Sequence, residues 1–235
     1  MATNAEILNA LAQANKDSNF SKRSKATYLG ILNDAHTYVI TETECLMKID
    51  SSITLVANTQ EYSVPSGFIK FPVLRYDGFK KGFVTLGDDG EHPLTPVSIK
   101  ELDSMHTGWR GVDAGTPRYC YVTDEGTPKL GFFPAPSSTF ITNFGTTCRV
   151  YMVFAPTAIA DDSNRPFDNS NRLTFLQFSL KLHANWQIAL EDRNFTEAAS
   201  LKVSLDERIE TDIAKVATLF PMPHVAGFAS ELGVP

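Results

Sequence analysis

WRGVDAGTPRYCYVTDEGTPKLGFFPAP, residues 109–136, carries two short apolar runs on either side of a polar turn. The runs, residues 119–123 and 130–133, are rich in β-branched and aromatic side chains, which favour strands. An acidic pair followed by Gly126 lies between them, and a short loop that contains glycine is typical of a β-hairpin. Two strands alone are not stable in water, so the hairpin predicts a larger sheet around it.

Further short strands are expected on both sides of this hairpin. Residues 53–57 and 61–65 are expected to form a strand and its return strand around a turn. Residues 147–154, TCRVYMVF, are apolar on both faces, which indicates a strand that is covered on both sides or lies in a subunit interface. The repeated turn signals predict a small antiparallel β-sandwich or barrel over residues 51–156. Its other strand candidates are residues 68–76 and 83–86.

Capping signals predict where three helices begin. A hydroxyl or amide side chain three residues before a glutamate can accept the main-chain N–H of that glutamate and be capped in return. In each case apolar residues then follow at helical spacing. The three pairs are Thr3 with Glu6, Ser98 with Glu101 and Asn194 with Glu197.

The predicted fold class is α+β: N-terminal helices, a small antiparallel β-sandwich or barrel, and a C-terminal antiparallel helical hairpin with an extended tail. A second N-terminal helix is expected to start at Ser21 or Ser24 and run toward Lys48, with a kink or end possible at residues 41–43. A short loop between the two C-terminal helices makes them antiparallel neighbours. The predicted parts are N-terminal helices 1–50, a β domain 51–156, a linker 157–170, the helical hairpin 171–218 and the tail 219–235.

Some apolar residues are candidates for contacts with other proteins. The tail is apolar, yet its prolines and glycines forbid a long helix, so it is expected to need a groove on its own domain or on a partner. Trp109 and Trp186 are most simply core residues, with a subunit contact as the alternative for each. The candidate subunit-interface residues are Tyr151, Val153 and Trp186, and the candidate partner-binding residues are Phe220, Met222, Val225, Phe228 and Leu232.

Composition excludes some classes of protein. The 235 residues carry a net charge of −6, which argues against a reader of duplex DNA because neutralising phosphates needs a basic stripe. The N-terminus has no apolar core of a signal peptide, and no run of apolar residues is long enough to suggest a membrane span. Cys45, Cys120 and Cys148 are widely spaced, so they are expected to be buried reduced thiols of a protein made in a cytoplasm.

No chemical site is predicted: no catalytic, cofactor-binding or metal-binding residue is expected. The sequence lacks HExxH, GxSxG, a P-loop and GxGxxG. Asp88 and Asp89, flanked by glycines, suit a cation or a turn, and the turn is favoured. Asp161 and Asp162 suit a solvated linker or a charged rim that faces a lumen. The histidines, none of them in a ligand motif, are His36, His92, His106, His183 and His224.

The order of these segments resembles a known family. The β domain opens with ITLVANTQEYSVPSGFIKF, continues with GTPRYCYVTDEGTPKLGFFPAPSS and TTCRVYMVFAPTAI, and leads into RLTFLQFSLKLHANWQIALEDRNFTEAASL. This arrangement, over roughly residues 22–218, is similar to that of the head-to-tail adaptor (connector) proteins of tailed bacteriophages, particularly the short-tailed podovirus type.

The resemblance implies a structural, non-enzymatic role in the neck of the virion. Such adaptors form a ring, commonly of twelve subunits, that binds the portal protein, bridges it to the tail nozzle and surrounds the channel through which DNA is ejected. It implies assembly in the cytoplasm of the host bacterium, passage of DNA without sequence-specific binding, and no cofactor or membrane. The last 17 or so residues match no motif of the family, so their docking into the portal is a hypothesis.

Two other functions are compatible with the sequence. A β-sandwich recognition module could bind a host receptor or carbohydrate through aromatic and turn residues such as Trp109 and Asp88. A long helical hairpin is unusual in such a module. A hydrolytic enzyme is the least favoured, because no nucleophile or acid–base set occurs at a recognisable spacing.

Overall fold

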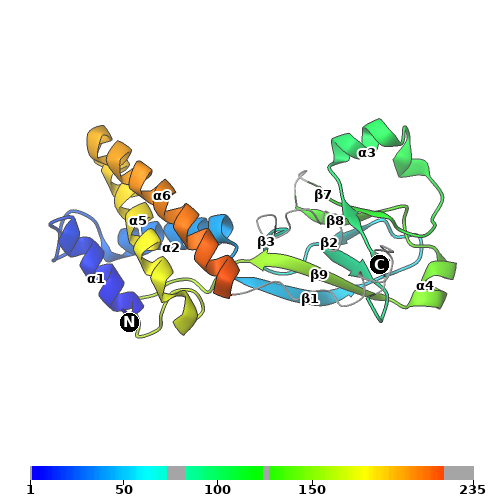
Figure 1. The fold of residues 1–235 in the computed structure, drawn as a ribbon, viewed down its shortest axis with the longest axis horizontal. Coiled ribbons are helices and arrows are strands. Elements are labelled where there is room, and N and C mark those ends of the chain that lie inside the picture. Colours follow the sequence, from blue (N-terminus) through cyan, green and yellow to red (C-terminus); the bar gives the residue numbers. More distant parts are fainter. Residues whose placement is uncertain (1, 73–82, 91, 124–126, 220–235) are drawn as a thin grey trace, which may run out of the picture. The chain divides into compact units, whose positions relative to one another are not determined.

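A computed structural model describes residues 2–72, 83–90, 92–123 and 127–219 (Figure 1). The chain forms two compact units. One joins Met1–Ala35 to Ile159–Pro235, described to residue 219, and the other is His36–Ala158. The first unit is helical and is built from both ends of the chain. The second contains all the described strands.

The helical unit begins with the predicted capping box. The Thr3 hydroxyl accepts the Glu6 N–H and the Glu6 carboxylate accepts the Thr3 N–H, which fixes the start of the first helix. The Asn194 side-chain oxygen accepts the Glu197 N–H at 3.4 Å, which caps the last helix, and the Asn194 side-chain amide donates to the Glu197 carboxylate at 2.6 Å. Both predictions are confirmed. The helices are α1 (Asn4–Ala14), α2 (Lys25–Thr43, which ends in the second unit), the 3₁₀ helix η2 (Asn171–Leu176), α5 (Gln177–Glu191) and α6 (Phe195–Leu219).

The predicted linker forms no helix or strand, yet it is tied to the N-terminal helices. The Asn33 amide donates to the Ile159 carbonyl at 3.1 Å and accepts the Ile159 N–H at 2.6 Å. Asp162 accepts the Asn4 amide at 2.8 Å, and Asp161 pairs with Lys25. The acidic pair of this segment therefore binds the linker to α1 and α2. Neither the solvated-linker nor the lumen-rim interpretation predicted this.

The β unit consists of two sheets. The first has the order β1-β9-β4-β5 with β3 also on β9, and the second has the order β2-β8-β7-β6. All pairs are antiparallel except β6 with β7. The strands are β1 (Met47–Thr54), β2 (Glu61–Ser63), β3 (Phe68–Lys70), β4 (Val84–Leu86), β5 (His92–Pro93), β6 (Thr95–Pro96), β7 (Tyr119–Thr123), β8 (Lys129–Phe133) and β9 (Thr147–Phe154).

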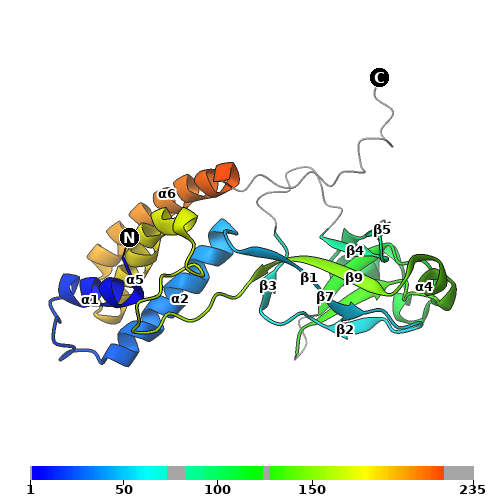
Figure 2. The same cartoon turned by 90° about the horizontal axis from the view of Figure 1, so that it is seen from below.

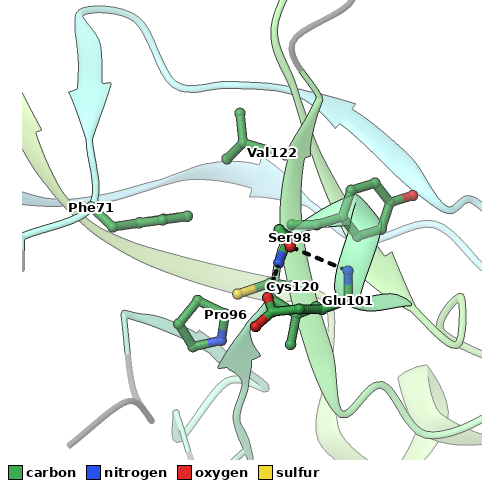
Figure 3. Close-up of a pocket in the computed structure, with 8 residues that line it drawn as sticks. Phe71, Pro96, Ser98, Glu101, Cys120 and Val122 are labelled. Atoms are coloured by element: carbon green, nitrogen blue, oxygen red, sulfur yellow. Dashed lines mark hydrogen bonds between the residues drawn. The ribbon is translucent and has the colours of Figure 1, made fainter. Parts of the chain in front are cut away.

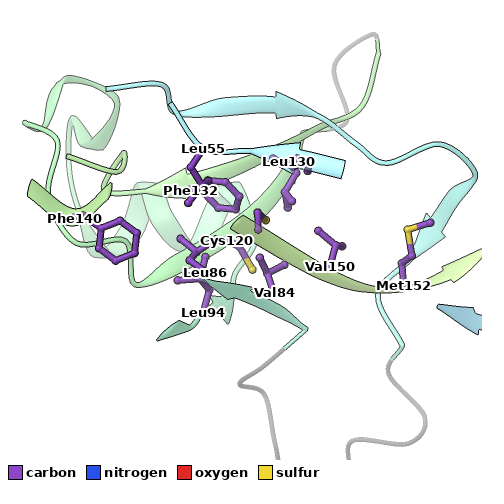
Figure 4. Packing of buried hydrophobic residues seen from close by; sticks show 12 residues of the cluster. Leu55, Val84, Leu86, Leu94, Cys120, Leu130, Phe132, Phe140, Val150 and Met152 are labelled. Carbon is purple, nitrogen blue, oxygen red and sulfur yellow. The ribbon is translucent and has the colours of Figure 1, made fainter. Parts of the chain in front are cut away.

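The core lies between the two sheets (Figure 4). Cys120 and Phe132 of the central hairpin meet Val150 of β9 there. Alternate residues of the same hairpin point the other way, because side chains alternate across a strand. Tyr121 and Phe133 pack on that side with Trp109. The sandwich is thus covered on its second face by α3 (Ile99–Met105) and the 3₁₀ helix η1 (Trp109–Gly111).

The central hairpin is confirmed, but the hairpin predicted over residues 53–57 and 61–65 is wrong. β7 and β8 pair in register from Tyr119 with Phe133 to Thr123 with Lys129. β1 instead pairs with β9, and β2 with β8. The turn between them is hydrogen-bonded to a distant segment, because the Asn58 N–H donates to the Pro136 carbonyl at 2.8 Å.

Several predicted boundaries also move. α2 ends at Thr43, short of Lys48 but within the predicted kink, because Glu44 takes a left-handed backbone (φ 50°) and β1 begins three residues later. The first turns of the predicted helical hairpin form η2. Helix α4 (Ser138–Phe144) was not predicted, although Ser137 caps it by accepting the Phe140 N–H. Only β3 forms within the described part of residues 68–76.

Candidate assembly surfaces

Helices α5 and α6 lie side by side and share a buried polar contact (Figures 1 and 2). Asp212 of α6 is fully buried, where an unpaired carboxylate would be costly. It accepts the hydroxyl of Ser179 on α5 and lies 3.0 Å from the Arg208 guanidinium. Arg208 also donates to the Phe175 carbonyl at 3.1 Å. The Ser179 bond joins α5 to α6, the Arg208–Asp212 pair lies within α6, and the Phe175 bond joins α6 to η2; no sequence motif predicted these contacts.

The same helices expose large apolar side chains. Phe178 is 55% exposed, and the Arg208 guanidinium lies over its ring at 5.2 Å. Trp186 is half-buried, beside His183 and under the Lys202 ammonium at 5.9 Å. An aromatic ring that is partly exposed next to a cation is common at protein interfaces. The other exposed apolar residues of the two helices are Leu190, Phe195, Val203 and Leu219.

The other two predicted interface residues lie on β9. Tyr151 is half-buried and sits directly opposite Ile49 of β1, whose side chain is exposed. Val153 is fully buried by its own chain, so it offers no surface to a partner in this conformation. Trp186 belongs to the helical unit, whereas Tyr151 and Val153 belong to the β unit. The partner-binding candidates Phe220, Met222, Val225, Phe228 and Leu232 lie outside the described residues.

A pocket of about 410 Å³ lies in the β unit, between Phe71, the segment after β6 and the face of β7 (Figure 3). Glu101 supplies its carboxylate, which accepts the Ser98 N–H at 2.7 Å in the predicted capping box of α3. Cys120 supplies its thiol, and burial raises the pKa of that thiol well above its ordinary value. The Glu101 carboxylate is engaged in the capping box and is not offered as a base, and a thiol that is not ionised is not a nucleophile.

The residue types singled out for chemistry have structural partners instead. The Asp88 carboxylate accepts the Thr147 hydroxyl at 2.7 Å and N–H at 3.3 Å, and the Thr147 hydrogen bond lowers its pKa. The favoured turn interpretation of Asp88 is thus confirmed. Burial lowers the pKa of His183 to about 4, so it is a neutral ring inside the helical unit. Trp109 is buried and donates its Nε1–H to Asp103 at 2.8 Å, as expected of a core residue.

The other histidines and the cysteines of the described part of the chain have structural surroundings too, and His224 lies outside the described residues. His92 packs edge-on against Phe144, and His106 packs against Phe133. All three cysteines are buried and form no disulfide, as predicted, and burial raises the pKa of Cys148 to about 12. Within the described residues no three histidine, cysteine or acidic side chains gather as metal ligands would. Nor does any described helix have the length and apolar character to cross a bilayer.

Comparison with models of protein families identifies the chain's family. A protein-family model described as SU10 adaptor protein matches residues 3–210. The match starts just before α1 and ends inside α6, so it covers both compact units. No curated protein matches the chain.

Proposed function

The chain belongs to the SU10 adaptor protein family, and on this premise we propose that it forms a homo-oligomeric ring that joins the portal to the tail of a bacteriophage and surrounds the DNA channel. The family makes the chain a phage adaptor, a structural component of the virion neck that contacts other head and tail proteins. The observation that carries the proposal is the extent of the match, which runs through both units rather than through one common hairpin or sheet.

Twelve copies, the number common in such adaptors, are proposed for the ring. The portal protein lies on one side of it and the tail nozzle on the other. Exposed Phe178, Phe195 and Val203 on α5 and α6 support an association of this kind, because monomers rarely leave several large apolar residues in water on one pair of helices. Native mass spectrometry of the chain, alone and with purified portal, tests it. A chain that stays monomeric with portal present contradicts the ring.

Trp186 of the helical unit and Tyr151 of the β unit are the proposed subunit contacts, and Val153 is buried by its own chain. Replacing Trp186 with Ala should lower the yield of rings while the monomer stays folded, because the ring of Trp186 is only half-buried. Val56→Ser is the matched control, since Val56 is 56% exposed but lies in a loop of the β unit. Equal loss of rings in both variants would argue against a specific contact.

The tail is proposed to dock on the portal through Phe220, Met222, Val225, Phe228 and Leu232. An apolar terminus that becomes ordered only when it binds a partner makes its contacts through its side chains. It loses conformational entropy on binding. A chain without residues 219–235 should therefore fold but fail to join portal-containing heads. A chain whose tail is replaced by Gly-Ser residues of equal length is the control for length. Normal joining by the truncated chain would refute the docking.

The ring is proposed to assemble in the host cytoplasm. DNA is proposed to pass through it during ejection without being bound tightly. The net charge of −6 supports this, since tight DNA binding depends on releasing counterions from many phosphates. The recognition-module alternative gains no support from its two named residues, because Trp109 is buried and Asp88 is bound to Thr147. Glycan-array binding without head joining is the result that would favour it.

A further inference from the structure

Strand β1 has an edge with which no other described strand pairs. It is the outermost strand of its sheet, with β9 on its other side. Two residues directly opposite each other in an antiparallel pair point their main-chain N–H and C=O groups either both toward the partner strand or both away from it. Tyr151 donates its N–H to the Phe83 carbonyl at 2.7 Å, away from β1. Ile49, directly opposite Tyr151, therefore points its main-chain groups out at the open edge, as does Met47.

One face of this edge is apolar. The side chains of Met47 and Ile49 lie on the face that also carries Tyr151, because side chains two residues apart share a face of a strand. Ile49 is 55% exposed. Lys48 and Asp50 lie on the opposite face, 3.6 Å apart. An open strand edge with an exposed large apolar side chain is a template for the addition of another strand.

Residues 220–235 have the sequence pattern of a strand that pairs along one edge only. In an extended chain, residues of the same parity share both a face and an edge. Pro221, Pro223 and Pro235 all have odd numbers, so they remove N–H donors from one edge and leave the even-numbered edge complete. Val225 is the one large apolar residue at an odd position. The large apolar residues at even positions are Phe220, Met222, Phe228, Leu232 and Val234.

We propose that residues 220–235 of one copy add as a strand to the open edge of β1 in a neighbouring copy. The even-numbered residues pair with Met47 and Ile49, which places the apolar face of the tail beside the apolar face of β1. The contact joins two different surfaces, and a head-to-tail contact of this kind gives a ring where its rotation closes. Only the presence of a neighbouring copy rests on the proposed function. The inference gives the tail a partner besides the portal.

Disulfide trapping between two full-length chains tests the register. One chain carries Ile49→Cys, and a second chain of different mass carries a single cysteine in its tail. Phe228→Cys and Ser230→Cys probe the even edge, and Ala229→Cys and Gly227→Cys are the matched odd controls. The native thiols are buried, so they do not compete. The mixture is oxidised at high concentration, both free and with portal-containing heads, and bonds between unlike chains are counted by mass spectrometry.

Bonds between unlike chains should form at the even positions in excess of the odd ones, on the order of tenfold, because only one parity brings the Cβ atoms within bonding distance. Equal trapping at both parities, bonds confined within one chain, or none with or without heads would overturn the inference. Joining to heads is scored separately. A chain that joins heads without even-position bonds refutes strand addition and leaves the adaptor ring standing.

Discussion

Replacing Gly131 with Ala should destabilise the β unit. Gly131 lies opposite Tyr121 in the central hairpin, and the Tyr121 ring covers it. A Cβ at Gly131 would come under 3.0 Å from the ring carbons, so the ring would have to move by about 1 Å to regain ordinary contact. Tyr121 cannot move freely, because it is buried edge-on against Trp109 at 5.0 Å.

The magnitude follows from these contacts. Overpacking a filled core costs about 1–3 kcal/mol. Displacing the edge-to-face pair of Tyr121 and Trp109 adds up to about 1 kcal/mol. The sum predicts a loss of about 1–4 kcal/mol in the free energy of unfolding. Gly30→Ala is the matched control: Gly30 lies inside α2 with nothing within 4 Å of the added carbon. There the same methyl group should stabilise by about 0.5–1 kcal/mol.

Urea unfolding followed by tryptophan fluorescence measures both changes. Trp186→Phe in the background leaves Trp109 as the reporter, and Trp109 lies in the cluster that Gly131→Ala disturbs. The transition midpoint should fall for Gly131→Ala and stay level or rise for Gly30→Ala. A Gly131→Ala chain within about 0.5 kcal/mol of the parent would show that Tyr121 repacks at little cost, and the reasoning would fail.

Three further outcomes concern the helical unit. His183 has its pKa lowered to about 4 by burial, so its contribution is complete above pH 6.5 and lost as the pH falls toward 4; His183→Gln should flatten thermal stability over that range. Burial alone would raise the pKa of Asp17, but hydrogen bonds from Lys22, Arg23 and Ser21 lower it to about 2. The parent therefore loses the stability that ionised Asp17 contributes only between about pH 4 and 2, and Asp17→Asn should lack that stability already at higher pH. Arg208→Ala leaves Asp212 buried without its cation and should lower the free energy of unfolding by about 3–5 kcal/mol. Asp212→Ala leaves the partly exposed Arg208 and should lower it by less. The reverse order in urea unfolding would contradict the pairing.

Local signals in the sequence predicted local structure well. The capping pairs Thr3 with Glu6, Ser98 with Glu101 and Asn194 with Glu197 are all formed, because a cap depends on residues three positions apart. The central hairpin is likewise set by its own turn and strands.

Partners far apart in the chain could not be predicted in this way. The strand at residues 53–57 was paired with its neighbour in sequence, whereas β1 pairs with β9, about a hundred residues away. The open edge at Ile49 depends on that strand order, so no sequence pattern revealed it. The same holds for the contact of Ser179 with Asp212, which requires the antiparallel packing of two helices. The lack of a catalytic motif was visible at once, because motifs are local.

The arrangement of the two units has a consequence for the order in which the chain matures on the ribosome. α1 packs against α5, and Asn15 donates to Asn185 at 3.0 Å, so the first helix waits for a partner made some 170 residues later. The segment His36–Ala158 is released whole before that partner exists, and it can fold first. α5 and α6 are made after this segment and complete the helical unit, so a chain that stalls before them carries a folded sandwich and two helices that lack their partners.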